Sequence, residues 1–107
     1  MTDSLELIKA SKYILIVTHI NPDPDTISSA LAISNFLADQ KIKHMVYNRD
    51  IKKFQSLKFL SRFEKISDVL PTFYDLVISV DCGDMKRFGF KPMADTKIIN
   101  IDHHLSN

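Results

Sequence analysis

Cysteine and glycine are scarce in this sequence. Cys82 is the only cysteine among the 107 residues, so no intrachain disulfide can form, which is typical of proteins from a reducing compartment. Only two glycines occur, Gly83 and Gly89, and this excludes a glycine-rich phosphate-binding loop of the GxGxxG or P-loop type. A bound phosphate would therefore have to be held by metal ions, by His, Lys or Arg side chains, or by a part of the protein outside these residues.

The chain also lacks long apolar runs and a large net charge. Its apolar runs cover only a few residues, fewer than a membrane-spanning helix or a secretory signal needs. The formal net charge of +1 gives no general indication of nucleic-acid binding. With 45% hydrophobic and 25% charged residues, the composition is that of an ordinary globular protein of one domain. We therefore expect a cytoplasmic protein with no membrane partner.

Helical and strand-like segments alternate along the chain. Helical periodicity occurs in residues 5–10, 26–40 and 51–63. Short apolar runs typical of buried strands occur in residues 13–18, 43–48, 74–81 and 97–102. Because largely apolar strands alternate with helical segments, the sequence predicts an α/β fold in which a parallel sheet carries helices on both faces.

A polar loop follows the first predicted strand. Residues 18–25 read THINPDPD, and four polar side chains fall on alternate positions: His19, Asn21, Asp23 and Asp25. Proline favours extended backbone in the residue before it, and alternate side chains of an extended chain share one face. One imidazole and two carboxylates would thus be offered to the same side. The alternative is a proline-rich turn in which Asp25 or Thr26 caps the following helix.

The residue types of this loop indicate a class of metal ion. Asp23 and Asp25 are close enough in sequence for each to bind one of two ions about 3.5–4 Å apart. A carboxylate-rich shell with one imidazole suits Mn²⁺ or Mg²⁺ better than structural zinc, which favours Cys and His ligands. The loop therefore favours two divalent ions over a structural zinc site.

Two further predicted strands end in residues of the same kind. Asp81 follows the third strand, and the run Asp102-His103-His104 follows the fourth. The carboxyl ends of parallel strands lie on one edge of the sheet, where α/β proteins usually bind their ligands. Acidic and histidine side chains after three separate strands therefore favour one shared site over independent turns and caps.

The ordered set of motifs resembles the DHH phosphoesterases. The likeness to the first three motifs of that family covers nearly the whole chain and rests on His19-x-Asn21-Pro22-Asp23-x-Asp25, Val80-Asp81 and Asn100-Ile101-Asp102-His103-His104. It implies a Rossmann-like domain that holds two Mn²⁺ ions. By matching position, one ion would be bound by His19, Asp23 and Asp81. The other would be bound by Asp25, Asp81 and His103, with Asp81 bridging the two.

The resemblance also implies a reaction. Two metal ions activate a shared water and neutralise the phosphoryl oxygens during in-line attack on a phosphate ester. His104 would face the phosphate, where it could donate to a phosphoryl oxygen or protonate the leaving oxygen. Asp102 would orient the histidine pair as a carboxylate that fixes the required tautomer.

The substrate class follows from the end of the sequence. Residues 100–107 are most similar to family members that degrade very short RNA and dephosphorylate 3′-phosphoadenosine 5′-phosphate. We therefore expect a small nucleotide or a short RNA or DNA oligonucleotide as substrate, with a homodimer as one possible assembly of the full-length protein. Two alternatives stay open: a catalytically impaired metal- or nucleotide-binding module, and a manganese-dependent pyrophosphatase.

Two features depart from the family pattern. Pro24 and Ser28 stand where the family usually has glycine. Pro24 should make the metal loop stiffer, and the side chain of Ser28 should hinder close approach of the helix and the loop. A fourth metal-binding Asp and a C-terminal substrate-binding domain are not found within the 107 residues. We therefore expect residues 1–107 to be an incomplete DHH N-terminal domain, which alone binds metal weakly and hydrolyses substrate poorly.

A few polar residues have an open role. Arg87 could contact a phosphate or form a local ion pair with Asp84, three residues away. Asn21 could support the site as a donor or only form a turn. Residues 41–65 contain eight Lys or Arg and two acidic residues, which indicates either a solvated surface or a weak electrostatic guide for an anionic substrate.

Overall fold

The computed structural model of the chain describes residues 2–80, 89–93 and 95–101. Its helices are α1 (Thr2–Ala10) and α2 (Pro24–Asp39), and two 3₁₀ segments follow, η1 (Ile51–Leu57) and η2 (Phe63–Lys65). Its strands are β1 (Ile14–Thr18), β2 (His44–Tyr47), β3 (Ile66–Ser67), β4 (Leu76–Val80) and β5 (Lys97–Ile101). Within these described ranges, no helix has the length and apolar character needed to cross a membrane.

The five strands form one sheet in the order β3-β2-β1-β4-β5, and every pair is parallel. The predicted α/β, Rossmann-like parallel sheet is therefore confirmed, and the four predicted strands are all present. Strand β3 was not predicted, because two residues are too few to produce a periodic signal.

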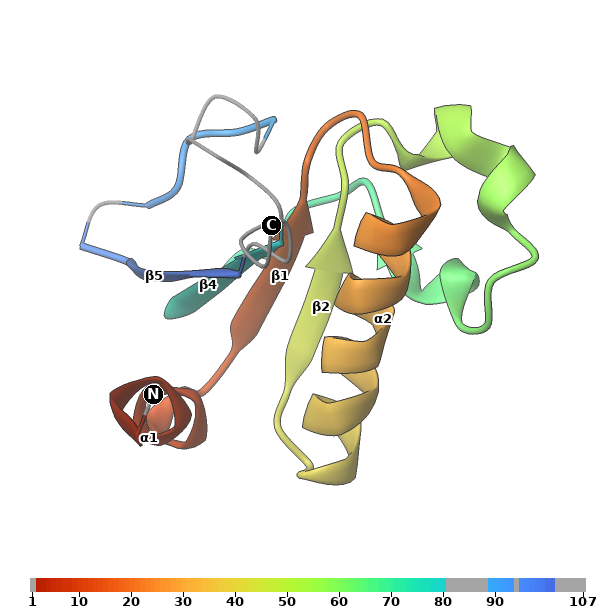
Figure 1. Cartoon of the computed structure of the whole chain (residues 1–107). Coiled ribbons are helices and arrows are strands. Elements are labelled where there is room, and N and C mark those ends of the chain that lie inside the picture. Colours follow the sequence, from red (N-terminus) through yellow and green to blue (C-terminus); the bar gives the residue numbers. More distant parts are fainter. Residues whose placement is uncertain (1, 81–88, 94, 102–107) are drawn as a thin grey trace, which may run out of the picture.

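Helix α2 covers one face of this sheet and packs against β1, β2 and β4 (Figure 1). Alternate strand residues point to that face, as the two-residue period of a strand requires. Ile16 of β1 and its register partner Ile78 of β4 belong to this core, together with Ile27 and Leu37 of the helix. All four side chains are buried, so the apolar stripe of α2 is matched by the stripe on the strands.

The opposite face carries a smaller core rich in aromatic side chains. Leu15, Val17 and Val77 point to it from β1 and β4, and Tyr74 is buried beside them. Phe90 packs on this core edge to face, with ring centroids 5.3 Å from Tyr47 and 6.4 Å from Tyr74. Strand and connecting residues make up the described part of this cluster. The first face is covered by α2 together with residues of the two 3₁₀ segments, and α1 packs against the same core.

The predicted helix over residues 51–63 is wrong as a continuous α-helix. Residues 51–57 form a 3₁₀ segment with a non-helical backbone at Phe54, and Arg62 has a left-handed backbone with φ 69°. The reason is visible in the spacing, since apolar residues recur every third position: Ile51, Phe54, Leu57, Leu60 and Phe63. A period of three matches the 3.0 residues per turn of a 3₁₀-helix better than the 3.6 of an α-helix.

Gly89 holds the chain after β4 against the loops that follow β1 and β2. Its φ is +84°, and an added Cβ would lie 2.9 Å from the Cβ of Arg49 and 3.0 Å from Cγ2 of Ile20. We expect Gly89→Ala to lower the free energy of unfolding by about 1–3 kcal/mol, because it combines left-handed strain with a steric clash. Urea denaturation measures this loss.

Gly89→Asn is the companion variant for this prediction. Asparagine tolerates positive φ better than alanine but carries the same Cβ. If both variants lose the same stability, the cause is the close approach of the added Cβ to Arg49 and Ile20. If Gly89→Asn loses much less than Gly89→Ala, the cause is the strain of a positive φ. A stability within 0.5 kcal/mol of the parent for both variants, roughly the range of harmless surface changes, would contradict the prediction.

Candidate metal site at the carboxyl edge of the sheet

The strand register brings three strand ends to one level. Thr18 of β1 is the register partner of Val80 in β4, and Val80 is the partner of Ile101 in β5. Strands β1 and β4 are neighbours in the sheet. The strand that follows β1 in sequence, β2, lies toward one edge of the sheet, and the strand that follows β4, β5, lies toward the other edge, so the carboxyl ends of β1 and β4 form the topological switch point. Ligands of α/β proteins bind in the crevice at such a point, and the polar loop of residues 19–23 begins there.

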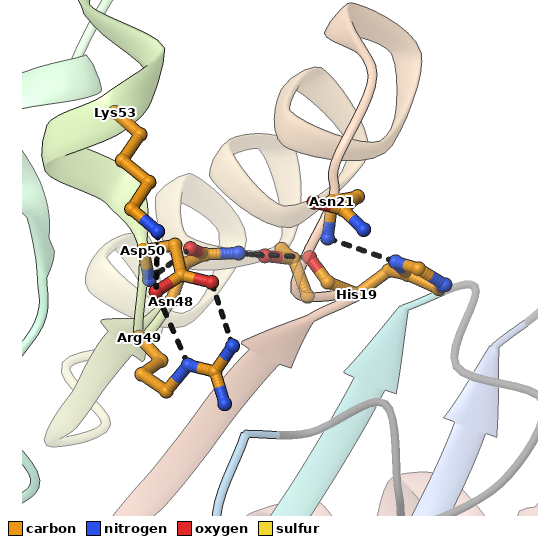
Figure 2. A network of polar contacts seen from close by, with 7 residues as sticks. His19, Asn21, Asn48, Arg49, Asp50 and Lys53 are labelled. Carbon is orange, nitrogen blue, oxygen red and sulfur yellow. Dashed lines mark hydrogen bonds and ion pairs between the residues drawn. The ribbon is translucent and has the colours of Figure 1, made fainter.

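His19 is the first residue after β1 and is half-buried. Its Nδ1 accepts a hydrogen bond of 2.9 Å from the backbone N–H of Asn21 (Figure 2). A ring nitrogen that accepts carries no proton, so the neutral ring carries its proton on Nε2. Asn21 therefore contributes through its backbone, and the fold of the loop fixes the tautomer of the imidazole.

This hydrogen bond sets a condition for metal binding at His19. Ligation through Nδ1 would replace the Asn21 amide, and ligation through Nε2 would require the proton to move to Nδ1, facing that amide. Binding of a cation by this ring therefore involves loss of the Asn21–His19 hydrogen bond in either case. An imidazole beside carboxylates still fits a divalent ion by its chemistry.

Asp23 is the N-cap of α2. Its backbone is extended, with φ −98° and ψ 172°, and its Oδ1 accepts a 2.8 Å hydrogen bond from the N–H of Thr26. Pro24 then occupies the first helical turn, where a missing N–H is harmless. The helix thus begins two residues before the predicted start at residue 26, and its cap is Asp23, not Asp25 or Thr26 as in the alternative interpretation of this loop. A carboxylate has about four lone-pair positions, so capping is compatible with metal ligation by the same group.

Asp25 lies inside the first turn of α2, and its side chain is exposed. The extended alternation that was expected to carry Asp23 and Asp25 to one face therefore ends at Asp23. Any approach of the two carboxylates depends on the helical turn instead. An acidic residue in this turn is favourable in itself, because the N-terminus of a helix carries a partial positive charge.

Asn48, which the sequence analysis did not single out, connects this loop to the neighbouring strand. It follows β2, is fully buried, and its Nδ2 donates 2.8 Å hydrogen bonds to Thr18 Oγ1 and to the His19 carbonyl oxygen. Its Oδ1 accepts from the backbone N–H of Asp50 at 2.8 Å. Figure 2 shows the side chain lying between the β1 and β2 loops. Every polar atom of this amide is used, so it fixes the backbone of His19 relative to β2.

The next two residues form a charged pair at the same edge. The guanidinium of Arg49 donates from Nε and Nη2 to the two carboxylate oxygens of Asp50, at 3.1 and 2.8 Å. These hydrogen bonds lower the pKa of the Asp50 carboxyl and raise the pKa of Arg49. Lys53 lies 4.0 Å from the same carboxylate. The pair is therefore a local, bidentate contact between neighbouring residues of the β2–η1 loop.

Several predicted site residues lie outside the described residues: Asp81, Arg87, Asp102, His103 and His104. Asp81 follows Val80 directly and Asp102 follows Ile101 directly, so both come next in sequence after the aligned row of strand ends. Among residues 2–80, 89–93 and 95–101, no three His, Cys, Asp or Glu side chains come together in a group able to hold a metal ion. The described part of the site is thus the His19–Asp25 loop and its support by Asn48.

A parallel α/β sheet with a His- and Asp-bearing loop at its switch point is the framework of a ligand-binding, Rossmann-like domain. Comparison with protein families makes the assignment specific: the profile of the DHH family N-terminal domain matches residues 13–107, and the chain belongs to the DHH family. That family consists of metal-dependent phosphoesterases whose members generally bind divalent metal ions. No curated protein matches the chain.

Proposed function

We propose that this protein hydrolyses phosphate esters of small nucleotides or very short oligonucleotides with the help of two divalent ions, Mn²⁺ being the expected metal. The observation that carries the proposal is the aligned row of strand ends. Thr18, Val80 and Ile101 share one level, and the sequence continues from them into His19, Asp81 and Asp102. Family membership supports the reaction class, and the register supports the proposal that the distant motifs act together.

The residues that would hold the ions follow the motif positions. One ion would take His19, Asp23 and Asp81, and the other Asp25, Asp81 and His103. When bound, such ions supply Lewis-acid activation of the attacking water and neutralise charge on the phosphoryl oxygens. The Asp81 carboxylate, as a residue that both ions would use, would offset the repulsion between two dications.

The chain's own residues would position these groups and move the proton. Asn48 holds the His19 carbonyl, and the N-cap bond holds Asp23 at the start of α2. Asp102 would accept from the histidine pair and fix its tautomer, as outer carboxylates do at metal sites. His104 would donate a proton to the leaving oxygen, since imidazole titrates near neutral pH.

A metal titration with a substrate panel tests this proposal. The panel consists of 3′-phosphoadenosine 5′-phosphate, a dinucleotide, cyclic di-AMP and pyrophosphate, each with Mn²⁺, Mg²⁺ or EDTA. We expect Mn²⁺-dependent release of product from the first two substrates, and loss of that turnover in Asp81→Ala.

The other outcomes discriminate the alternatives. Preferred hydrolysis of pyrophosphate would replace the ester substrate by a pyrophosphatase function on the same metals. Metal binding without turnover of any substrate would indicate an impaired binding module. Turnover that persists in EDTA or in Asp81→Ala would contradict a metal-dependent reaction at this edge.

A further inference from the structure

A hollow lies along the outer edge of β2, where β3 stops short. Strand β3 pairs only with Val46 and Tyr47, so the edge of β2 at His44 and Met45 is left open on that side in the described structure. The resulting hollow has a volume of about 330 Å³, within the lower range of small-molecule sites. Its size admits a phosphate group together with part of the molecule that carries it.

The lining of this hollow is positively charged. Arg62 and Lys65 contribute two permanent cations, and none of the described lining residues is acidic. His44 and Ser34 also line it, but they satisfy each other. The Nδ1–H of His44 donates to the Ile42 carbonyl at 2.8 Å, and Nε2 of the neutral ring accepts from Ser34 Oγ at 2.8 Å. His44 and Ser34 therefore line the hollow without neutralising the charges of Arg62 and Lys65.

Arg62 carries two unusual features at this position. Its Nε is buried and has no hydrogen-bond partner among the described residues, which is rare for a polar group in a native protein. Its backbone is left-handed with φ 69°, a conformation that persists only where the surroundings impose it. Phe63, buried in the core, and the Lys65 N–H to Arg62 carbonyl bond of 2.9 Å hold the turn in place. The turn contacts account for the backbone, and the buried Nε is out of reach of a ligand in the hollow, so a bound anion would be met by the Nη groups of Arg62.

We propose that Arg62 and Lys65 bind the phosphate group of a small anionic ligand in this hollow. A guanidinium donates two parallel hydrogen bonds to phosphate oxygens, and an ammonium adds a second charge. Arg62 also borders a hollow of about 260 Å³ beside α2, but that one offers no second cation. The anion is therefore assigned to the hollow that contains Lys65.

This site is distinct from the metal site. His44 pairs with Ile14, the first residue of β1, whereas His19 follows the last residue of that strand. A five-residue strand separates these two levels by roughly 15 Å. Ser67, which lines the hollow nearer the carboxyl edge, belongs to β3, and β2 lies between β3 and β1 in the sheet. The anion site therefore does not depend on the proposed phosphoesterase activity, and each can fail without the other.

The test is a titration of the full chain followed by ¹H–¹⁵N NMR in EDTA at constant ionic strength, with inorganic phosphate, AMP and adenosine. We expect saturable shifts at the amides of residues 43–46 and 61–67 with phosphate and AMP, and none with adenosine. Tighter binding of AMP than of inorganic phosphate would identify a nucleotide as the ligand that carries the phosphate group. Equal binding would identify free phosphate as the ligand. No saturable shift, or shifts confined to residues 19–25, would overturn the proposal.

Arg62→Gly is the decisive variant, because glycine suits the left-handed backbone and keeps the turn. We expect phosphate affinity to fall about tenfold or more at an unchanged or higher melting temperature, since a charge-assisted bidentate contact is lost. Lys65→Gln, an exposed change that leaves folding intact, should weaken binding in the same direction. The matched control is Lys58→Gln, exposed and outside the hollow. Affinity retained in Arg62→Gly, or lost equally in the control, would overturn the proposal.

Discussion

Asp23→Asn is expected to reduce metal-dependent turnover by at least about 100-fold while leaving the fold intact. Metal ions contribute several kcal/mol to phosphoryl transfer, and each 1.4 kcal/mol is roughly a factor of ten in rate. Asparagine is as good an N-cap as aspartate, so the hydrogen bond from Thr26 N–H is kept. Only the negative charge and one strong ligand oxygen are removed. Steady-state kinetics over a Mn²⁺ titration, together with thermal melting, measures both effects.

Asp23→Ala separates the two roles of this residue. Alanine removes the cap as well as the ligand, so we expect the same loss of turnover and a further loss of about 1 kcal/mol in stability. Asp39→Asn is the matched control, since it makes the same chemical change at the exposed far end of α2. Turnover should be unchanged there. Full activity of Asp23→Asn at saturating Mn²⁺ would show that Asp23 is a helix cap and no ligand.

The fold could be predicted from the sequence because its core follows simple periods. Side chains along β1 and β4 alternate between the two faces of the sheet, with Ile16 and Ile78 on the face that α2 covers. The apolar residues of α2 lie on one stripe of the helix. The α-helix predicted for residues 51–63 was wrong for a local reason. Apolar residues recur every three positions from Ile51 onward, and a three-residue period is easily mistaken for the 3.6-residue period of an α-helix. Strand β3 is held in the sheet by its partner β2, and two residues carry no information of their own.

The candidate site was predictable only in part, for a physical reason. The sequence shows that His and Asp residues follow several predicted strands. Parallel strands place their carboxyl ends on one edge of the sheet. Which strands are neighbours is a tertiary property, so Asn48 could not be connected to His19 beforehand. A signal was present all the same: a polar residue directly after an apolar strand needs partners if it is buried. The helix start at Pro24 was also readable, from a proline directly after an Asp.

Asn48→Asp should produce the largest loss of stability among single changes at this edge. A carboxylate cannot donate, so Thr18 Oγ1 would lose one partner and the His19 carbonyl would face a buried negative charge. Breaking a buried polar network of this kind costs about 2–5 kcal/mol, a large share of the 5–15 kcal/mol typical of a small domain. Urea denaturation at pH 7 measures the loss, with Asn35→Asp on the exposed face of α2 as the matched control.

The pH dependence of that loss identifies its cause. Burial raises the pKa of the introduced carboxyl above its value in the unfolded chain. A raised folded-state pKa means that the group is tolerated when protonated, below the unfolded value near 3.9, and becomes destabilising as the pH rises above it. The difference in stability from the parent should therefore be smaller at about pH 4 than at pH 7. Because the same amide holds the His19 backbone, Mn²⁺ affinity should fall about 10–100-fold, as for other outer partners of metal ligands. A loss as small as that of Asn35→Asp, or one independent of pH, would contradict the view that Asn48 fixes the metal loop through buried donors.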